Sequence, residues 1–267
     1  MRIHKGIEML DISAAVLGKK DTVHPTLIWD EERAVLIDTG YPGQLPLFLE
    51  AFQKADVPLE KLRNIIITHQ DLDHIGSLPA ILEHAPTEIE VLTTELEKPY
   101  IEGKKMTPEA IAQVDSMIPP NVPEDWVKAF KAVLNNPPKG RVNRTIKDGE
   151  FLPYGYGIQV VFTPGHTPGH TSLYHLESKT LIAGDALVII DGVLHPPDSQ
   201  QTLDMEEAIR SLQKLTVLDI QQVICYHGGL YSGDVNKRLK ELAMINQGTL
   251  PLPENVLFPS LWHKAKP

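Results

Sequence analysis

The chain has 267 residues and a formal net charge of −10, and 42% of its residues are hydrophobic while 22% are charged. This length suits one large domain with a buried core, and the composition is that of an ordinary globular protein. The acidic balance argues against nucleic acid as a partner, because proteins that bind its phosphates usually present a basic face. No apolar stretch approaches the roughly 20 residues of a membrane span.

Neither the first ten residues nor the cysteine content suggests export. Met1 to Leu10 carry charges and lack the apolar region of a signal peptide. Cys225 is the only cysteine, so no disulfide can form within the chain, and its apolar neighbours predict a buried core residue. We therefore expect a cytoplasmic protein that acts on a small molecule, with neither nucleic acid nor membrane as a partner.

Short aliphatic runs bounded by Gly, Pro or Asp alternate with helix-like patterns along the chain. The predicted strands are Thr22–Trp29, Ala34–Asp38, Asn64–Thr68, Glu88–Leu92, Ile158–Thr163, Ser172–His175, Thr180–Ala183 and Gln221–Tyr226. The predicted helices are Leu45–Ala55, Gly76–Glu83, Pro108–Met117, Glu124–Leu134, Asp204–Leu215 and Val235–Ile245, with Asp204 and Asp234 as N-caps. Tight turns at Glu31-Glu32 and at Glu177 to Lys179 join pairs of strands. This mixture predicts one α/β domain over residues 1–267, with sheets covered by helices on their outer faces.

The stretch from approximately residue 95 to residue 141 differs from its surroundings because it is helical and rich in proline. It falls between two groups of candidate ligands, so we expect an inserted helical cap over a site rather than a separate domain. Trp126 and Phe130 lie at helical spacing within it. Core packing is the default interpretation of that pair, and lining of an apolar pocket is the alternative.

The most informative segment runs from Thr68 to Gly76, directly after an apolar run. His69, Asp71, Asp73 and His74 fall within six residues there. Imidazole and carboxylate are the ligands that zinc, iron and manganese accept. A polar loop that caps the following helix is the alternative interpretation, but it would use only one of the four side chains.

Three later strand-like runs also end in candidate ligands. The first leads into Pro164-Gly165-His166, the second into Gly184-Asp185, and the third into His227-Gly228-Gly229. Each of these loops contains glycine, which lets the backbone turn sharply beside a crowded site. Four separate strand ends that each deliver His or Asp predict a metal site.

The order of these motifs resembles the metallo-β-lactamase superfamily of hydrolases. The resemblance extends from about Thr22 to Gly229 and includes the run Leu36-Ile37-Asp38-Thr39-Gly40. It implies a four-layer αββα sandwich with a dinuclear metal site at one edge. It also implies the role of each ligand: the first metal is bound by His69, Asp71 and His166, the second by Asp73, His74 and His227, and both by Asp185.

Asp71 departs from the family pattern, in which most members have His. A carboxylate is a harder ligand, which shifts the preference of the first metal from zinc toward iron or manganese. We expect two divalent ions, with zinc as the first choice and iron or manganese as alternatives. Members of the family are often dimers, so a homodimer is expected by analogy.

The resemblance and the chemistry together predict a metal-dependent hydrolase. Two metals can share a hydroxide because each lowers the pKa of bound water toward ~7. That hydroxide attacks the substrate, and Asp73 beside it is the candidate catalytic residue that orients it or carries a proton. The acidic surface and partly apolar cap favour a small ester, lactone or thioester. A di-iron redox protein and a metal-binding module without turnover are the alternatives.

Other polar residues near these motifs have less specific signals. His170 repeats the Pro-Gly-His triplet, and we expect it to support a loop or a ligand rather than to bind metal. Asp38 either accepts a hydrogen bond from a ligand histidine or closes a turn. His195 faces either the substrate or solvent. Tyr231 is a candidate for the substrate-polarising tyrosine that lactonases of this family carry, because none follows Asp185.

Overall fold

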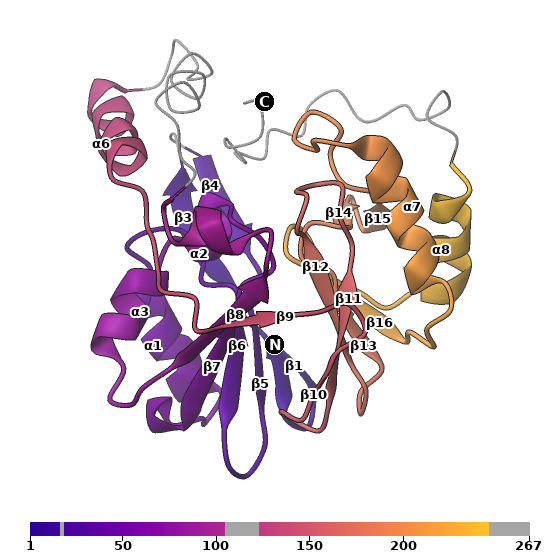
Figure 1. The fold of residues 1–267 in the computed structure, drawn as a ribbon, viewed down its shortest axis with the longest axis horizontal. Coiled ribbons are helices and arrows are strands. Elements are labelled where there is room, and N and C mark those ends of the chain that lie inside the picture. The colour runs from indigo at the N-terminus through magenta and orange to yellow at the C-terminus, as the bar shows by residue number, and fades with distance from the viewer. Residues whose placement is uncertain (17–18, 105–122, 246–267) are drawn as a thin grey trace.

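The structure is a computed structural model that describes residues 1–16, 19–104 and 123–245. Two β-sheets pack face to face, and helices cover the outer side of each (Figure 1). This arrangement is the αββα sandwich expected from the sequence, so the predicted fold class is confirmed.

The first sheet has seven strands in the order β1-β2-β5-β6-β7-β8-β9, and the second has six in the order β10-β11-β12-β13-β16-β17. Strands β6 to β9 run parallel, as do β13 and β16. Two further hairpins, β3–β4 and β14–β15, stand outside the sheets. The bounds are Arg2–His4 (β1), Ile7–Met9 (β2), Ile12–Val16 (β3), Lys19–Val23 (β4), Thr26–Trp29 (β5), Ala34–Ile37 (β6), Leu62–Ile66 (β7), Glu90–Thr94 (β8), Arg144–Ile146 (β9), Phe151–Leu152 (β10), Ile158–Phe162 (β11), Thr171–His175 (β12), Thr180–Ile182 (β13), Val188–Ile190 (β14), Val193–His195 (β15), Gln222–Cys225 (β16) and Gly229–Tyr231 (β17).

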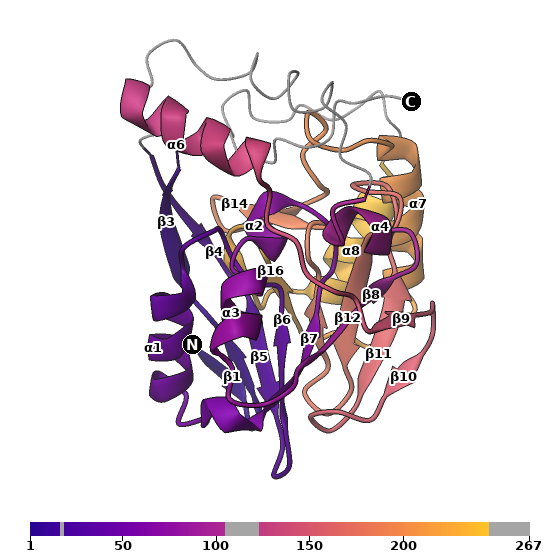
Figure 2. The same cartoon turned by 60° about the vertical axis from the view of Figure 1, so that its left-hand side comes forward.

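Two helices cover each sheet. Helices α1 (Leu45–Lys54) and α3 (Leu78–His84) lie on the first sheet, and α7 (Met205–Leu215) and α8 (Val235–Ala243) lie on the second (Figure 1). The short elements η1 (Leu59–Lys61), α2 (Leu72–Ile75) and α4 (Lys98–Ile101) lie in the connections of the first half. Helix α6 (Glu124–Asn135) lies at the same end of the molecule as the β3–β4 hairpin in both views (Figures 1 and 2).

Three layers of apolar side chains hold the sandwich together. Leu36 belongs to the core beneath α1 and α3, whereas its neighbours Val35 and Ile37 belong to the core between the sheets. In the second sheet Cys225 faces the core beneath α7 and α8, and Ile224 faces the inner core. Because both faces of these strands are covered, they are apolar throughout rather than alternating. The predicted burial of Cys225 is confirmed.

The predicted elements that fall on described residues are present, most of them with ends within two residues of the prediction. One prediction was wrong: Thr22–Trp29 is not a single strand. It divides into β4 and β5 at His24-Pro25, because proline has no backbone N–H to donate to a sheet. The predicted helix over Pro108–Met117 and the side chains of Trp126 and Phe130 lie outside the described part of the structure.

The predicted turns and helix caps agree with the structure. The two tight turns join β5 to β6 and β12 to β13. Asp204 accepts a hydrogen bond from the backbone N–H of Glu207 at 2.9 Å, and Asp234 accepts one from Lys237 at 3.1 Å. These bonds satisfy N–H groups in the first turns of α7 and α8, which is the purpose of an N-cap.

Helix α2 was not predicted, and a glycine sets its position. The helix predicted over Gly76–Glu83 corresponds to α3, and α2 is a separate helix that ends just before Gly76. A Cβ on Gly76 would lie 2.3 Å from the backbone N of Pro42 and 2.4 Å from the carbonyl carbon of Tyr41. Gly76 has helical φ, so close packing rather than backbone conformation requires glycine. This contact fixes α2 against the loop that follows β6.

We predict that Gly76→Ala lowers the free energy of unfolding by about 1–3 kcal/mol, because the added methyl group meets backbone atoms that cannot rotate away. Gly140→Ala is the matched control. The Cβ there would meet the side-chain tip of Leu78 at 2.6 Å, which can change rotamer. Urea unfolding measures both variants, and an equal loss in the two would contradict the packing argument.

Candidate metal centre

The seven candidate ligands lie together in one buried cluster. Four loops carry them, and these loops follow β7, β11, β13 and β16, so the strand ends converge as the sequence suggested. Each of the seven residues is at most 7% exposed. They are His69, Asp71, Asp73, His74, His166, Asp185 and His227.

Asp71 lies between two of the histidines. Its Oδ2 is 3.4 Å from Nε2 of His69 and 3.3 Å from Nε2 of His166. Asp185 contacts the same pair, because its Oδ2 is 3.9 Å from His69 Nε2 and 3.4 Å from His166 Nε2. The polar atoms of these residues therefore converge on one point.

A second group of polar side-chain atoms converges around Asp73. Its Oδ2 is 3.1 Å from Nε2 of His227 and 3.7 Å from Nε2 of His74. Asp185 contacts this pair too, with Oδ2 3.5 Å from His227 Nε2 and Oδ1 3.4 Å from His74 Nε2. Asp185 thus lies between the two groups of ligands.

Helix α2 contributes two of these side chains and begins within the ligand motif. Asp71 occupies its N-cap position but makes no capping hydrogen bond with its side chain. Asp73 and His74 lie in the helix, one after the other. The helix-capping interpretation of the motif therefore does not describe Asp71 or Asp73.

Hydrogen bonds behind the cluster fix two imidazole rings. Thr68 Oγ1 donates to Asp38 Oδ2 at 2.8 Å, so it accepts from Nδ1 of His69 at 3.0 Å. His74 Nδ1 donates to the same Asp38 oxygen at 2.9 Å. Both rings then carry hydrogen on Nδ1 and direct Nε2 into the cluster, where a bound metal would take the place of a proton on that nitrogen. Asp38 therefore accepts a hydrogen bond from His74, the first of the two roles considered for it.

The cluster favours positive charge. Burial alone would lower the pKa of His74, but Asp185, Asp38 and Asp73 outweigh it and raise that pKa well above its usual value. Burial likewise opposes protonation of His227, but Asp185 and Asp73 raise its pKa to about 10. Burial would raise the pKa of Asp185, yet His227 and His74 hold it well below the usual range. A cation placed among these carboxylates would therefore be stabilised.

His170 lies behind the cluster and supports it. Its Nε2 accepts the backbone N–H of Asp185 at 2.9 Å, and its Nδ1 bonds to the carbonyl of Thr163 at 3.1 Å. Burial and the nearby His69 and His166 lower its pKa well below the usual value, so it is neutral and can accept that bond. This arrangement agrees with the expectation that His170 holds a loop rather than a metal.

Two positioning residues were missed by the sequence analysis, and Glu97 is the first. Fully buried, it joins the loops that carry the first ligand group. Its Oε1 accepts from Thr167 Oγ1 at 2.7 Å and from the backbone of Gly169 at 2.8 Å, and its Oε2 accepts from the backbone of Gln70 at 3.1 Å. Burial raises the pKa of Glu97, while the bond from Thr167 opposes that effect. No local motif marks this residue.

Tyr226 is the second positioning residue that the sequence analysis missed. Its ring stacks on the ring of His74 with centroids 3.8 Å apart. Its hydroxyl donates to the backbone carbonyl of Asp73 and accepts from the backbone N–H of Gly40. Tyr226 directly precedes the candidate ligand His227, and that position was the only available signal.

Several combinations of the cluster could hold a metal ion. Asp73 Oδ1 and Asp185 Oδ1 are buried and have no hydrogen-bond partner among the described residues, and neither has Nε2 of His74. Buried oxygens of this kind are costly unless a cation or a donor satisfies them. In the described part of the chain, three groups of candidate ligand atoms lie close together: His69 with Asp71 and His166, His69 with His74 and Asp185, and Asp73 with His74 and His227.

A small cavity of about 20 Å³ reaches the cluster. Three candidate ligands, His166, Asp185 and His227, line it together with Leu187, Val188, Pro197, Asp198 and Gln201. His195 and Tyr231, the other candidates for substrate contact, are not among the described residues that line it.

Comparison with known proteins agrees with this geometry. The family model described as the metallo-β-lactamase superfamily matches residues 19–227. The chain belongs to this superfamily. Among its curated relatives, the probable metallo-hydrolase YflN of Bacillus subtilis is 29% identical over 225 residues, which cover 78% of this chain and 81% of the relative. The hydroxyacylglutathione hydrolase GloC of Haemophilus influenzae is 28% identical over 78% of this chain and 85% of the relative.

Solved structures of other superfamily members share the fold. The metallo-β-lactamase family protein TTHA1429 of Thermus thermophilus superposes with a TM-score of 0.69 at 23% identity, over 91% of this chain and 79% of that one. The superfamily protein ST1585 of Sulfolobus tokodaii gives a TM-score of 0.63 at 20% identity, over 95% of this chain and 91% of that one. Across the described residues, no helix has the length and apolar character needed to span a membrane.

We predict that Glu97→Ala weakens metal retention by roughly 10–100-fold, the usual effect of losing a residue that holds ligands in place. The reason is that Glu97 ties the Gln70 backbone to Thr167 and Gly169. Release of metal to a chelator measures the effect. Glu95→Ala, on the exposed neighbour two residues earlier, is the control. Equal metal release from the two variants would contradict this role.

Proposed function

We propose that this protein is a metal-dependent hydrolase that uses a dinuclear site to cleave a small ester, lactone or thioester. The observation that carries the proposal is the position of Asp185 between two groups of ligands, within 3.5 Å of a histidine in each. Membership of the metallo-β-lactamase superfamily and relatives named as metallo-hydrolases support the reaction class.

In this proposal the ligands divide as the family resemblance implied. His69, Asp71 and His166 would hold one ion, Asp73, His74 and His227 would hold the other, and Asp185 would contribute to both. Bound there, the ions would supply hydroxide at neutral pH by lowering the pKa of water, and would polarise the substrate oxygen. Zinc is the first choice, and iron or manganese is the alternative because Asp71 adds a hard oxygen ligand.

Asp73 is the proposed catalytic residue. Its Oδ2 lies 3.1 Å from His227 Nε2, while its Oδ1 is buried and has no hydrogen-bond partner among the described residues. Oδ1 can therefore orient an attacking water and accept its proton. The hydroxyl of Tyr226 holds the backbone carbonyl of Asp73, which keeps this carboxylate in place.

The residues around the small cavity favour a neutral substrate. Leu187, Val188 and Pro197 offer apolar contacts, and Asp198 adds a further negative charge. No lysine or arginine is among the described residues that line it. Glutathione thioesters carry carboxylates, so we place neutral esters and lactones ahead of them, although relatives include hydroxyacylglutathione hydrolases.

A di-iron redox protein is the second candidate function. Asp71 is the observation that favours it, because its carboxylate lies 3.3 Å from His166 in the place where most members of the superfamily have histidine. The expected homodimer and the cytoplasmic location remain predictions.

The deciding experiment combines metal analysis with a substrate panel. We predict that protein purified without added metal contains two divalent ions per chain and hydrolyses at least one neutral ester or lactone. A chelator should abolish this activity, and added zinc or manganese should restore it. Full activity without metal would contradict the proposal, as would two redox-active irons with no hydrolysis. Bound metal without turnover of any substrate would favour a binding module.

We predict that Asp185→Asn lowers metal content and activity together, with activity falling by at least about 100-fold. The reason is that loss of a residue that only holds a ligand in place already lowers metal affinity or activity by roughly 10–100-fold. Asp191→Asn is the matched control: that residue is an exposed turn residue with φ 51°, which asparagine tolerates. Two tightly bound ions in Asp185→Asn would contradict the bridging role.

A further inference from the structure

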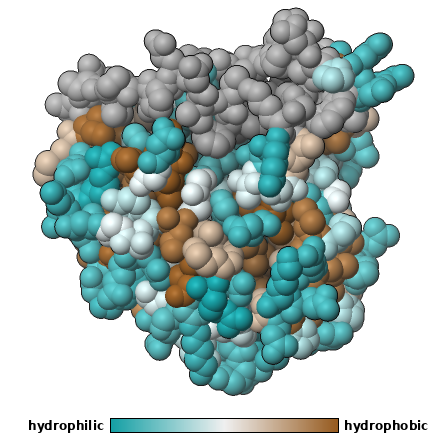
Figure 3. Space-filling view, turned by 180° about the vertical axis from the view of Figure 1, so that it is seen from behind, coloured by the Kyte–Doolittle hydropathy of each residue, from teal (hydrophilic) through white to brown (hydrophobic). Residues whose placement is uncertain are grey.

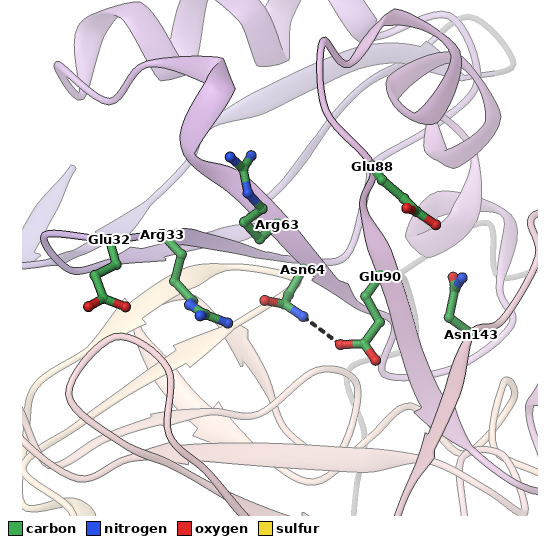
Figure 4. A pocket seen from close by; sticks show the side chains of 7 residues that line it. All are labelled: Glu32, Arg33, Arg63, Asn64, Glu88, Glu90 and Asn143. Carbon is green, nitrogen blue, oxygen red and sulfur yellow. Dashed lines mark hydrogen bonds between the residues drawn. The ribbon is translucent and has the colours of Figure 1, made fainter.

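A second cavity, of about 520 Å³, lies at the opposite end of the first sheet from the metal cluster. Its walls come from the residues that begin or precede β6, β7, β8 and β9, whereas the metal cluster follows the carboxyl ends of strands. On the face shown in Figure 3, the lower part of the molecule is covered mainly by hydrophilic side chains. Figure 4 shows the residues that line the cavity: Glu32, Arg33, Arg63, Asn64, Glu88, Glu90 and Asn143.

Asn64 is a buried amide in the middle of an apolar parallel sheet. It lies on β7 between Val35 of β6 and Glu90 of β8 and is 2% exposed. Its Nδ2 donates to Glu90 Oε2 at 2.9 Å. Its Oδ1 has no hydrogen-bond partner among the described residues. A buried acceptor without a donor is costly, and a donor supplied by a ligand would satisfy it.

Arg33 supplies a cation whose only charge partner in the described ranges is Asp30, which it meets through space and not through a salt bridge of its guanidinium. The half-buried side chain stacks over the ring of Tyr154 at 5.3 Å. Its guanidinium makes no salt bridge or hydrogen bond within the described ranges, and it points toward the Asn64 amide (Figure 4). An arginine held by stacking keeps its N–H groups available for a carboxylate, which it can bind through two parallel bonds.

The remaining lining groups are mostly carboxylates. Glu90 faces Asn64, and Glu32 and Glu88 lie on opposite sides of the cavity (Figure 4). The other cation, Arg63, is already occupied: its guanidinium donates to Thr87 Oγ1 at 2.7 Å and to the carbonyl of Glu60. The cavity therefore offers one available cation, one unsatisfied amide oxygen and an excess of negative charge.

We propose that this cavity binds a free basic amino acid. The Arg33 guanidinium donates hydrogen bonds to the α-carboxylate. Asn64 Oδ1 and the Glu90 carboxylate accept hydrogen bonds from the α-ammonium group. Glu32 and Glu88 then favour a second positive charge on the side chain, as in lysine or arginine. The site is independent of the proposed hydrolase function, because no residue in it belongs to the metal cluster.

Titration calorimetry of the metal-loaded protein tests the proposal, with a panel of free L-amino acids, Nα-acetyl-lysine, lysine methyl ester and cadaverine. We expect saturable binding that is tightest for lysine and arginine. Acetylation of the α-amino group, esterification of the carboxylate, or removal of the carboxylate in cadaverine should each weaken binding at least 10-fold.

Variants assign this binding to the cavity. We predict that Arg33→Ala and Glu90→Gln each weaken lysine binding at least 10-fold and leave metal content unchanged. Gln keeps an oxygen that accepts the bond from Asn64, so Glu90→Gln tests the charge even if Arg33→Ala fails to fold. Glu60→Gln, an exposed carboxylate outside the cavity with the same change in charge, should bind lysine normally. No binding by any amino acid, equal binding of cadaverine and lysine, or unchanged affinity in both cavity variants would overturn the proposal.

Discussion

Mutual repulsion among three buried carboxylates is the constraint on which the rest of this structure depends. Asp71, Asp73 and Asp185 are at most 7% exposed and lie within one cluster. Such a group is tolerated only if positive charge lies between its members, because burial removes the water that would otherwise stabilise them. The histidines supply that charge when protonated, and a metal ion supplies it more strongly. The cluster is therefore a site whose stability and chemistry both depend on a cation.

Outer residues hold these repelling groups at fixed positions. Asp38 accepts a hydrogen bond directly from His74 and reaches His69 through Thr68, so one carboxylate sets the orientation of a candidate ligand in each proposed metal group. Glu97 joins the loop of Gln70 to the loop of Thr167 by hydrogen bonds to both. Tyr226 holds α2 in place through the backbone carbonyl of Asp73. These side chains act through other residues, yet the geometry of the site rests on them as much as on the ligands.

The sequence marks the candidate ligands more clearly than the residues that position them. His166, Asp185 and His227 each come within four residues of the end of an apolar strand, and the ends of these strands converge, so a linear pattern marks them. Glu97 has no such mark, because it follows β8 in an irregular segment and meets Thr167 only through the fold. Asn64 was counted as the start of a strand, and only the parallel register that places it beside Glu90 makes it notable.

Asp71 links the chemistry of the site to its electrostatics. A carboxylate in place of the usual histidine lowers the net charge of a loaded site by one unit, since imidazole binds metal as a neutral ligand. The site would then attract an anionic substrate less strongly, and the acidic Asp198 at the cavity wall acts in the same direction. Both features favour neutral substrates over anionic ones, so the departure from the family pattern bears on substrate choice as well as on the identity of the metal.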